Sequence, residues 1–274
     1  MTKDEDWMFF SVKIPEGDLF EVARKMEEEF LENPKEHIIK MIEHQNEWYK
    51  EFITLPLFQG RQDRLKIFFD FYKEYSILIG KMLDKKTIHG GVFKDGPEVV
   101  KTIQRLKEQL KTIEDYNKNK FDETTALRLA RVYASSLETF WKKIKKIIFF
   151  AGLNQKDKYL KINELFTKTI ELEKIYELNL PNIKSTLNSK LRNSVGHEDT
   201  YFIPPNTLVF SERINGEVKE IARFTTEEIY QLLVTITLIN IAIHHVENTA
   251  MVSTLTPLLK LTNEEIKEKL NNLR

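Results

Sequence analysis

Apolar residues recur three or four positions apart along most of the chain, and this spacing is the strongest constraint on its fold. Residues 19–31 and residues 126–150 show the pattern most clearly. An α-helix completes a turn every 3.6 residues, so this spacing collects apolar side chains on one face. We therefore predict a mainly α protein built from amphipathic helices.

Further helices are expected wherever the same period continues between Pro and Gly residues. Their expected ranges are residues 34–42, 64–83, 99–116 and 163–177, a shorter helix starting at Pro181, one from Thr225 toward Glu247, and a last one after Thr262. In the helix from Pro181, the apolar residues Ile183, Leu187, Leu191 and Val195 are spaced by four and are expected to face the core.

One β-hairpin is expected to interrupt the helices. Residues 207–214 and 217–224 flank Asn215-Gly216, the dipeptide that best accommodates the positive φ angles of a type I′ turn. Thr225 and Glu228 then form a capping-box pattern before a helix that is apolar on all sides. The expected fold is a helical bundle with one β-hairpin inserted before a long buried helix.

Two regions are expected along the chain. The polar run of residues 115–122 separates the first helices from the long pattern that begins near Thr124. We place a boundary there, between a helical region of unassigned role (residues 1–120) and a helical domain (residues 121–274). A stretch with three glycines, residues 87–97, is expected to form a loop or hinge inside the first region.

Composition excludes several classes of protein. The 274 residues include no Cys, so thiol nucleophiles, disulfides and thiolate zinc sites are ruled out. The N-terminus is acidic, unlike a secretory signal, and the uninterrupted apolar runs fall well short of the roughly 20 residues that cross a bilayer. We expect a cytoplasmic protein with no membrane span.

Residues 191–197, Leu-Arg-Asn-Ser-Val-Gly-His, carry the clearest candidate for chemistry. Arg192 and His197 lie five residues apart, and on a continuous helix they would diverge by about 140°. Gly196 can take the left-handed conformation that ends a helix, which leaves Arg192 in the last turn and His197 free to swing back. A permanent cation and a titratable imidazole are then expected to face one site.

This stretch resembles the motif of the higher eukaryotes and prokaryotes nucleotide-binding (HEPN) family. Members carry Arg, a polar residue, and His after four to six intervening residues in a helical bundle, and Asn193 is the matching polar residue here. The resemblance covers about residues 124–250. It implies a metal-independent endoribonuclease without a cofactor, acting on RNA as a homodimer with a composite site, in a toxin or antiviral role and with a protein partner or inhibitor.

The chemistry implied for these residues suits their side chains. A guanidinium can bind phosphate oxygens with two parallel hydrogen bonds, a role for Arg192. An imidazole titrates near neutral pH and can move protons, a role for His197. Asn193 can orient either group or cap the last helical carbonyls. The alternative is a HEPN-like module that binds or dimerises without cleaving RNA, in which Arg192 and His197 only end a helix.

The middle of the chain is basic, although Lys plus Arg equals Asp plus Glu overall, at 42 each. Residues 128–192 hold 14 basic and 6 acidic residues. A group of lysines in this region could follow an RNA phosphate backbone, or form an ordinary solvated helix face. These RNA-binding candidates are Lys142, Lys143, Lys146 and Lys190.

The remaining histidines have less specific patterns. His37 and His44 lie seven residues apart near Glu47, where a metal pair or two solvent-facing side chains would fit, and we favour the solvent-facing interpretation. His244 and His245, near Glu247, either support the Arg192 site or are structural. We predict no metal site.

Overall fold

The computed structural model describes residues 28–52, 57–58, 60–85, 96–118, 122–154, 160–187, 200–214 and 217–271. These residues are mainly helical, with one small antiparallel sheet before a long helix, which confirms the predicted fold class. The labelled elements are α2 (Pro34–Phe52), α3 (Gln62–Asp84), α4 (Gly96–Lys118), α5 (Glu123–Phe150), α6 (Ile162–Tyr176), α7 (Pro181–Leu187), β1 (Thr200–Ile203), β2 (Thr207–Ile214), β3 (Glu217–Thr225), α9 (Thr226–Leu255), the 3-10 helix η2 (Thr256–Lys260) and α10 (Asn263–Asn271).

The chain divides into two compact units, each assembled from separate stretches. The first contains Met1–Gln62, Ile88–Gln104 and His244–Arg274, and the second contains Asp63–Thr87 and Arg105–Ile243. The boundary that the sequence analysis places near residue 121 separates regions expected to fold independently, which is a different property from this division into compact units. That boundary stays a prediction.

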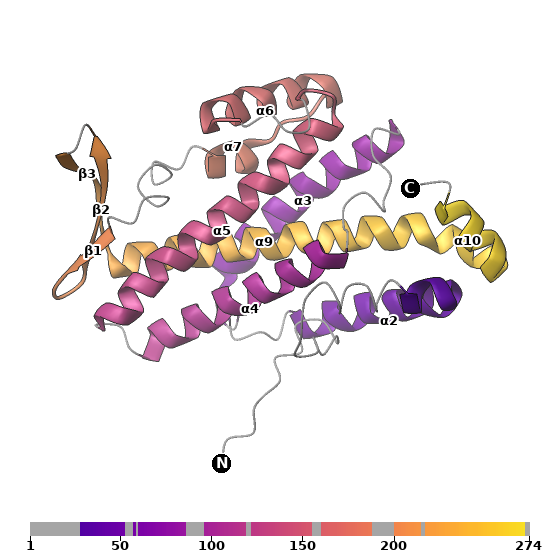
Figure 1. Ribbon diagram of the computed structural model, residues 1–274, viewed down its shortest axis with the longest axis horizontal. Coiled ribbons are helices and arrows are strands. Elements are labelled where there is room, and N and C mark those ends of the chain that lie inside the picture. The colour runs from indigo at the N-terminus through magenta and orange to yellow at the C-terminus, as the bar shows by residue number, and fades with distance from the viewer. Residues whose placement is uncertain are drawn as a thin grey trace, which may run out of the picture. The chain divides into compact units, whose positions relative to one another are not determined.

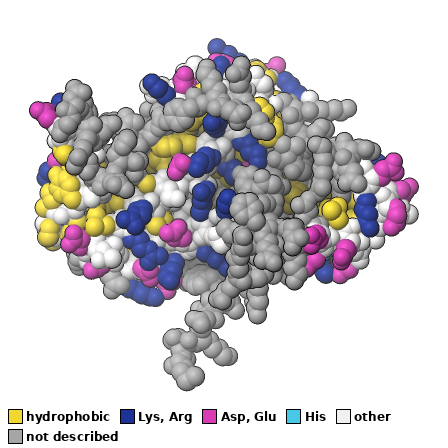
Figure 2. Space-filling model, in the orientation of Figure 1, with side chains coloured by type: hydrophobic (Ala, Val, Ile, Leu, Met, Phe, Trp, Pro, Cys, Tyr) yellow, Lys and Arg dark blue, Asp and Glu magenta, His cyan; other side chains and the backbone are white. Residues whose placement is uncertain are grey.

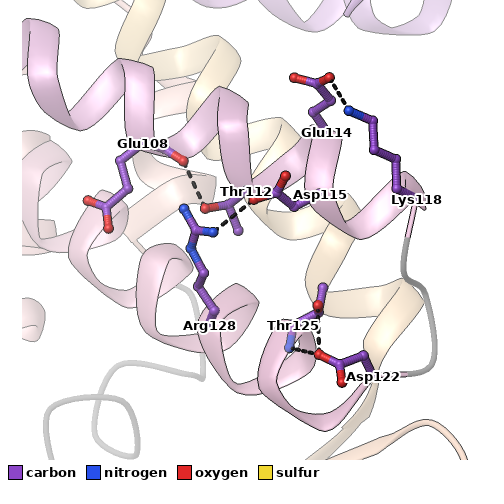
Figure 3. A network of polar contacts seen from close by, with 8 residues as sticks. All are labelled: Glu108, Thr112, Glu114, Asp115, Lys118, Asp122, Thr125 and Arg128. Carbon is purple, nitrogen blue, oxygen red and sulfur yellow. Dashed lines mark hydrogen bonds and ion pairs between the residues drawn. The ribbon is translucent and has the colours of Figure 1, made fainter. Parts of the chain in front are cut away.

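In the second unit, α5 and the part of α4 from Arg105 onward form an antiparallel pair joined by polar contacts (Figure 3). The Arg128 guanidinium on α5 bonds the Asp115 carboxylate on α4 at 2.8 Å, and further along the pair Arg105 donates to Thr139 Oγ1 at 3.0 Å. Asp122 caps α5, because its carboxylate accepts from the Thr125 N–H at 2.7 Å. The polar run of residues 115–122, which the sequence analysis places between the helices, is partly helical, because α4 continues to Lys118.

The sheet has the strand order β1-β2-β3 and packs against α5 (Figure 1). The predicted hairpin is confirmed, since β2 and β3 pair antiparallel from Ile214↔Glu217 to Thr207↔Thr225. The sequence analysis missed β1, which pairs with β2 from Thr200↔Phe210 to Ile203↔Thr207. Four residues are too short a stretch for a period of two to stand out.

The long helix α9 begins at the predicted capping box. The Glu228 carboxylate accepts from the Thr225 N–H at 2.7 Å, and the Glu228 N–H donates to Thr225 Oγ1 at 3.2 Å. Residues 236–247 are all buried, as the apolar pattern predicts. Within the second unit, Asn240 on this helix donates to the Ser136 carbonyl of α5 at 3.2 Å.

Residues Thr226–Lys260 are also long and apolar enough to cross a membrane by length and composition. The sequence analysis counted only uninterrupted apolar runs and did not identify this segment. In the structure 83% of its most apolar window is buried inside the protein, and core helices of soluble proteins pass the same test.

In the first unit, α10 and η2 pack against α2. Asn263 Nδ2 donates to Asn33 Oδ1 at 3.1 Å, and Asn263 Oδ1 accepts from the Lys35 N–H. The predicted capping box before α10 is present, with Glu265 accepting from the Thr262 N–H at 2.7 Å. The two contacts of Asn263 connect residues more than 200 positions apart.

Candidate functional site

The Arg192–His197 motif lies outside the described residues, and so do Asn193 and Lys190. The structure describes the chain on both sides of it, up to Leu187 at the end of α7 and again from Thr200 at the start of β1. Both flanking elements belong to the second unit. The site is therefore described through the elements that hold these two ends.

The helix before the motif, α7, faces the core as predicted over its described length. Ile183 and Leu187 are buried, one turn apart on the same face. Pro181 occupies the first helical position, where its missing N–H costs no hydrogen bond. Leu191 and Val195, the remaining members of the predicted apolar face, lie outside the described residues.

A buried carboxylate from α3 caps α7. Glu74 Oε2 accepts from the Asn182 N–H at 2.9 Å and from Asn182 Nδ2 at 2.7 Å, while Oε1 accepts from the Ile183 N–H at 2.8 Å. Glu74 is only 8% exposed, and burial raises its pKa above the ordinary value, although these hydrogen bonds act in the opposite direction. Glu74 thus satisfies two N–H groups of the first turn that have no partner within the helix.

A second carboxylate fixes the connection between α6 and α7. Glu173 Oε1 accepts from the Leu180 N–H at 2.6 Å and forms an ion pair with Lys184 Nζ at 2.7 Å. Leu180 itself is buried. Together, Glu74 and Glu173 orient the helix that leads to Arg192.

Sequence reasoning missed these two carboxylates. A signal for Glu74 was present, because it lies on the same helical face as Phe71, Tyr75 and Leu78, all of which are buried. A charged residue at a position that the helical period assigns to the core is expected to have hydrogen-bond partners. The sequence does not identify those partners, since Asn182 is 108 positions away.

On the far side of the motif, the chain enters β1. Thr200 pairs with Phe210 of β2, whose side chain is fully buried, and β1 also packs against α5. The two ends of the motif-bearing segment are therefore both held by packed elements.

The three described RNA-binding candidates on α5 differ in their access to solvent. Lys142 is exposed and pairs with Glu138 at 2.7 Å. Lys146 is partly exposed. Lys143 is only 5% exposed, because it lies on the side of α5 that packs into the core.

His244, His245 and Glu247 are all buried near the end of α9. His244 Nε2 lies 3.2 Å from Asn248 Nδ2, and His245 Nδ1 lies 3.1 Å from Gln45 Nε2 on α2. These contacts give both imidazoles a structural role. Whether either also supports the Arg192 site stays a prediction.

No metal centre is formed by the residues that the structure describes, which contain no group of three or more His, Asp or Glu side chains able to hold an ion. His37 is partly buried and makes an edge contact with Phe30, with the ring centroids 6.1 Å apart. The side chain of His44 lies outside the described part of the chain.

Comparison with known proteins gives no match: no family model fits the sequence, and no curated protein or solved structure is significantly similar to it.

Proposed function

We propose that this protein is a metal-independent endoribonuclease of the HEPN type, in which Arg192 and His197 act on RNA. The observation that carries the proposal is the Arg192-Asn193 pair followed by His197, in the stretch of sequence that continues from α7, a core-facing helix that ends at Leu187 in the described part of the chain. Glu74, which caps α7, and Glu173, which fixes the residue before it, support the proposal, because catalytic groups must be held by rigid elements.

In the proposed reaction the 2′-oxygen of a ribose attacks the adjacent phosphorus, and the bond from phosphorus to the 5′-oxygen breaks. The products are a 2′,3′-cyclic phosphate and a free 5′-hydroxyl. Arg192 binds the phosphate oxygens on which negative charge grows, and His197 moves protons between the two oxygens. Asn193 orients either group or caps the helix end.

The proposal includes a homodimer in which two motifs form one composite site. One imidazole then accepts the proton of the 2′-hydroxyl while the other donates a proton to the leaving 5′-oxygen. Lys142 and Lys146 are proposed to contact the RNA backbone, together with Lys190. The proposed setting is the cytoplasm, in a toxin or antiviral role under the control of a protein partner or inhibitor.

The test incubates the purified protein with mixed RNA in EDTA, alongside Arg192→Ala and His197→Ala variants. Cleavage should resist chelation and fall by about 10²- to 10⁴-fold when His197 is removed. His37→Ala and Arg223→Ala are matched controls on α2 and β3 and should retain activity. Cleavage that EDTA abolishes, or that survives both motif substitutions, would contradict the proposal. A folded but inert wild type would favour the binding module.

A further inference from the structure

The solvent-facing side of α5 carries a line of charged side chains. Residues 128, 131, 135, 138, 142 and 145 are spaced by three and four, so they form one stripe along the helix. All six are exposed or partly exposed. Four of them are cationic, namely Arg128, Arg131, Lys142 and Lys145, and one is acidic, Glu138.

Two of these cations can bind a ligand without breaking an ion pair formed within the described residues. Arg128 is paired with Asp115, and Lys142 with Glu138. Arg131 and Lys145 have no ion-pair partner among the residues that the structure describes. They lie 14 residues apart, close to four full turns, which places their Cα atoms about 21 Å apart on the same side of α5.

The surroundings of the stripe fit a polyanion better than a folded protein. Figure 2 shows many Lys and Arg side chains over α5 and the neighbouring α4, with a smaller number of Asp and Glu side chains among them. The exposed large apolar side chains of the described residues all lie on other elements, such as α3, α6 and the sheet. A protein interface needs an apolar centre, whereas a phosphate backbone needs only spaced cations.

We propose that the α5 stripe binds the phosphate backbone of single-stranded RNA at two points, Arg131 and Lys145. This inference rests on the proposed ribonuclease function and adds the surface along which the substrate lies. None of the six residues of the stripe is aromatic, so the stripe itself recognises the backbone and positions the strand without reading its sequence.

The test measures binding of a fluorescein-labelled single-stranded RNA of about 20 nucleotides by anisotropy at several salt concentrations. The full-length His197→Ala protein is used so that the RNA stays intact. Replacing Arg131 and Lys145 by Gln should lower the slope of log affinity against log salt by about 1.4, since each phosphate contact on a single strand contributes about 0.7. Loss of these two contacts should lower the affinity for RNA about tenfold near physiological salt.

The matched control is the Lys73→Gln/Lys260→Gln double variant, which removes the same charge from exposed positions on α3 and η2. It should bind RNA as the parent does. An unchanged slope in the α5 variant, or an equal loss in the control, would overturn the proposal. The proposal would also be overturned if this protein bound polyglutamate but not RNA, because that result would indicate an acidic protein partner.

Failure of this proposal and failure of the ribonuclease function give different results. If cleavage depends on Arg192 and His197 but the salt slope of the Arg131/Lys145 variant is unchanged, only the proposed α5 surface is refuted. Binding that depends on Arg131 and Lys145 without any cleavage by the wild type supports the surface and counts against the catalytic function.

Discussion

Removing the Glu74 carboxylate should destabilise the second unit by about 2 kcal/mol. In Glu74→Ala the Ile183 N–H, which belongs to a residue only 1% exposed, loses its acceptor, at a cost of about 1–3 kcal/mol. The Asn182 N–H is partly buried and can reach water, so its loss is smaller, about 0.5 kcal/mol. Burial raises the pKa of Glu74, which shows that its charged form is costly to bury. Removing this charge therefore offsets part of the destabilisation caused by the two lost hydrogen bonds.

Urea denaturation followed by circular dichroism gives the free energy of unfolding, and amide hydrogen exchange at Ile183 reports α7 directly. Asp70→Ala is the matched control, because Asp70 also lies on α3 but is exposed, and within the described part of the chain its ion-pair partner is Lys66. Its effect should stay below about 0.5 kcal/mol. If Glu74→Ala changed stability no more than Asp70→Ala, or left Ile183 fully protected, the capping argument would be refuted.

The pH dependence of the same site has a definite sign. Because burial raises the Glu74 pKa above its ordinary value of 4.5, the folded protein keeps this proton to higher pH than the unfolded chain. The stabilising effect of Glu74 is thus complete below pH 4.5 and declines as pH rises through the folded pKa. The unfolding free energy of wild type minus that of Glu74→Gln, measured by urea titration, should fall as the pH rises above 4.5, and a rise in this quantity would contradict the argument. At the start of α9, Thr225→Ala should cost about 1 kcal/mol, whereas Thr225→Ser should unfold near wild type. The Glu228 pKa, which hydrogen bonds from Thr225 hold below its usual value, should rise in Thr225→Ala when followed by NMR, and an unchanged pKa would argue against the capping box.

Local patterns were sufficient for most of the secondary structure. The Asn215-Gly216 hairpin, the Thr225 and Thr262 capping boxes and the burial of the helix after Thr225 all follow from residues a few positions apart. Such signals are readable because turn geometry, capping and helical period involve only neighbouring residues. The first half of the predicted apolar face around Ile183 and Leu187 was confirmed for the same reason.

Long-range contacts decided the rest. The pairing of β1 with β2, the partners of Glu74 and the contact between His245 and Gln45 all join segments that the sequence does not place side by side. Lys143 is buried although the neighbouring lysines are exposed or partly exposed, because it lies on the side of α5 that meets the core.

The sequence by itself determined where this chain forms helices and a hairpin, and it placed Arg192 and His197 five residues apart across a glycine. Only the tertiary structure decided which carboxylates hold the helix before that motif and which cations on α5 remain open to solvent. The physical reason is that the energy of a buried charge or an exposed cation depends on its surroundings in the folded chain, and distant segments supply those surroundings.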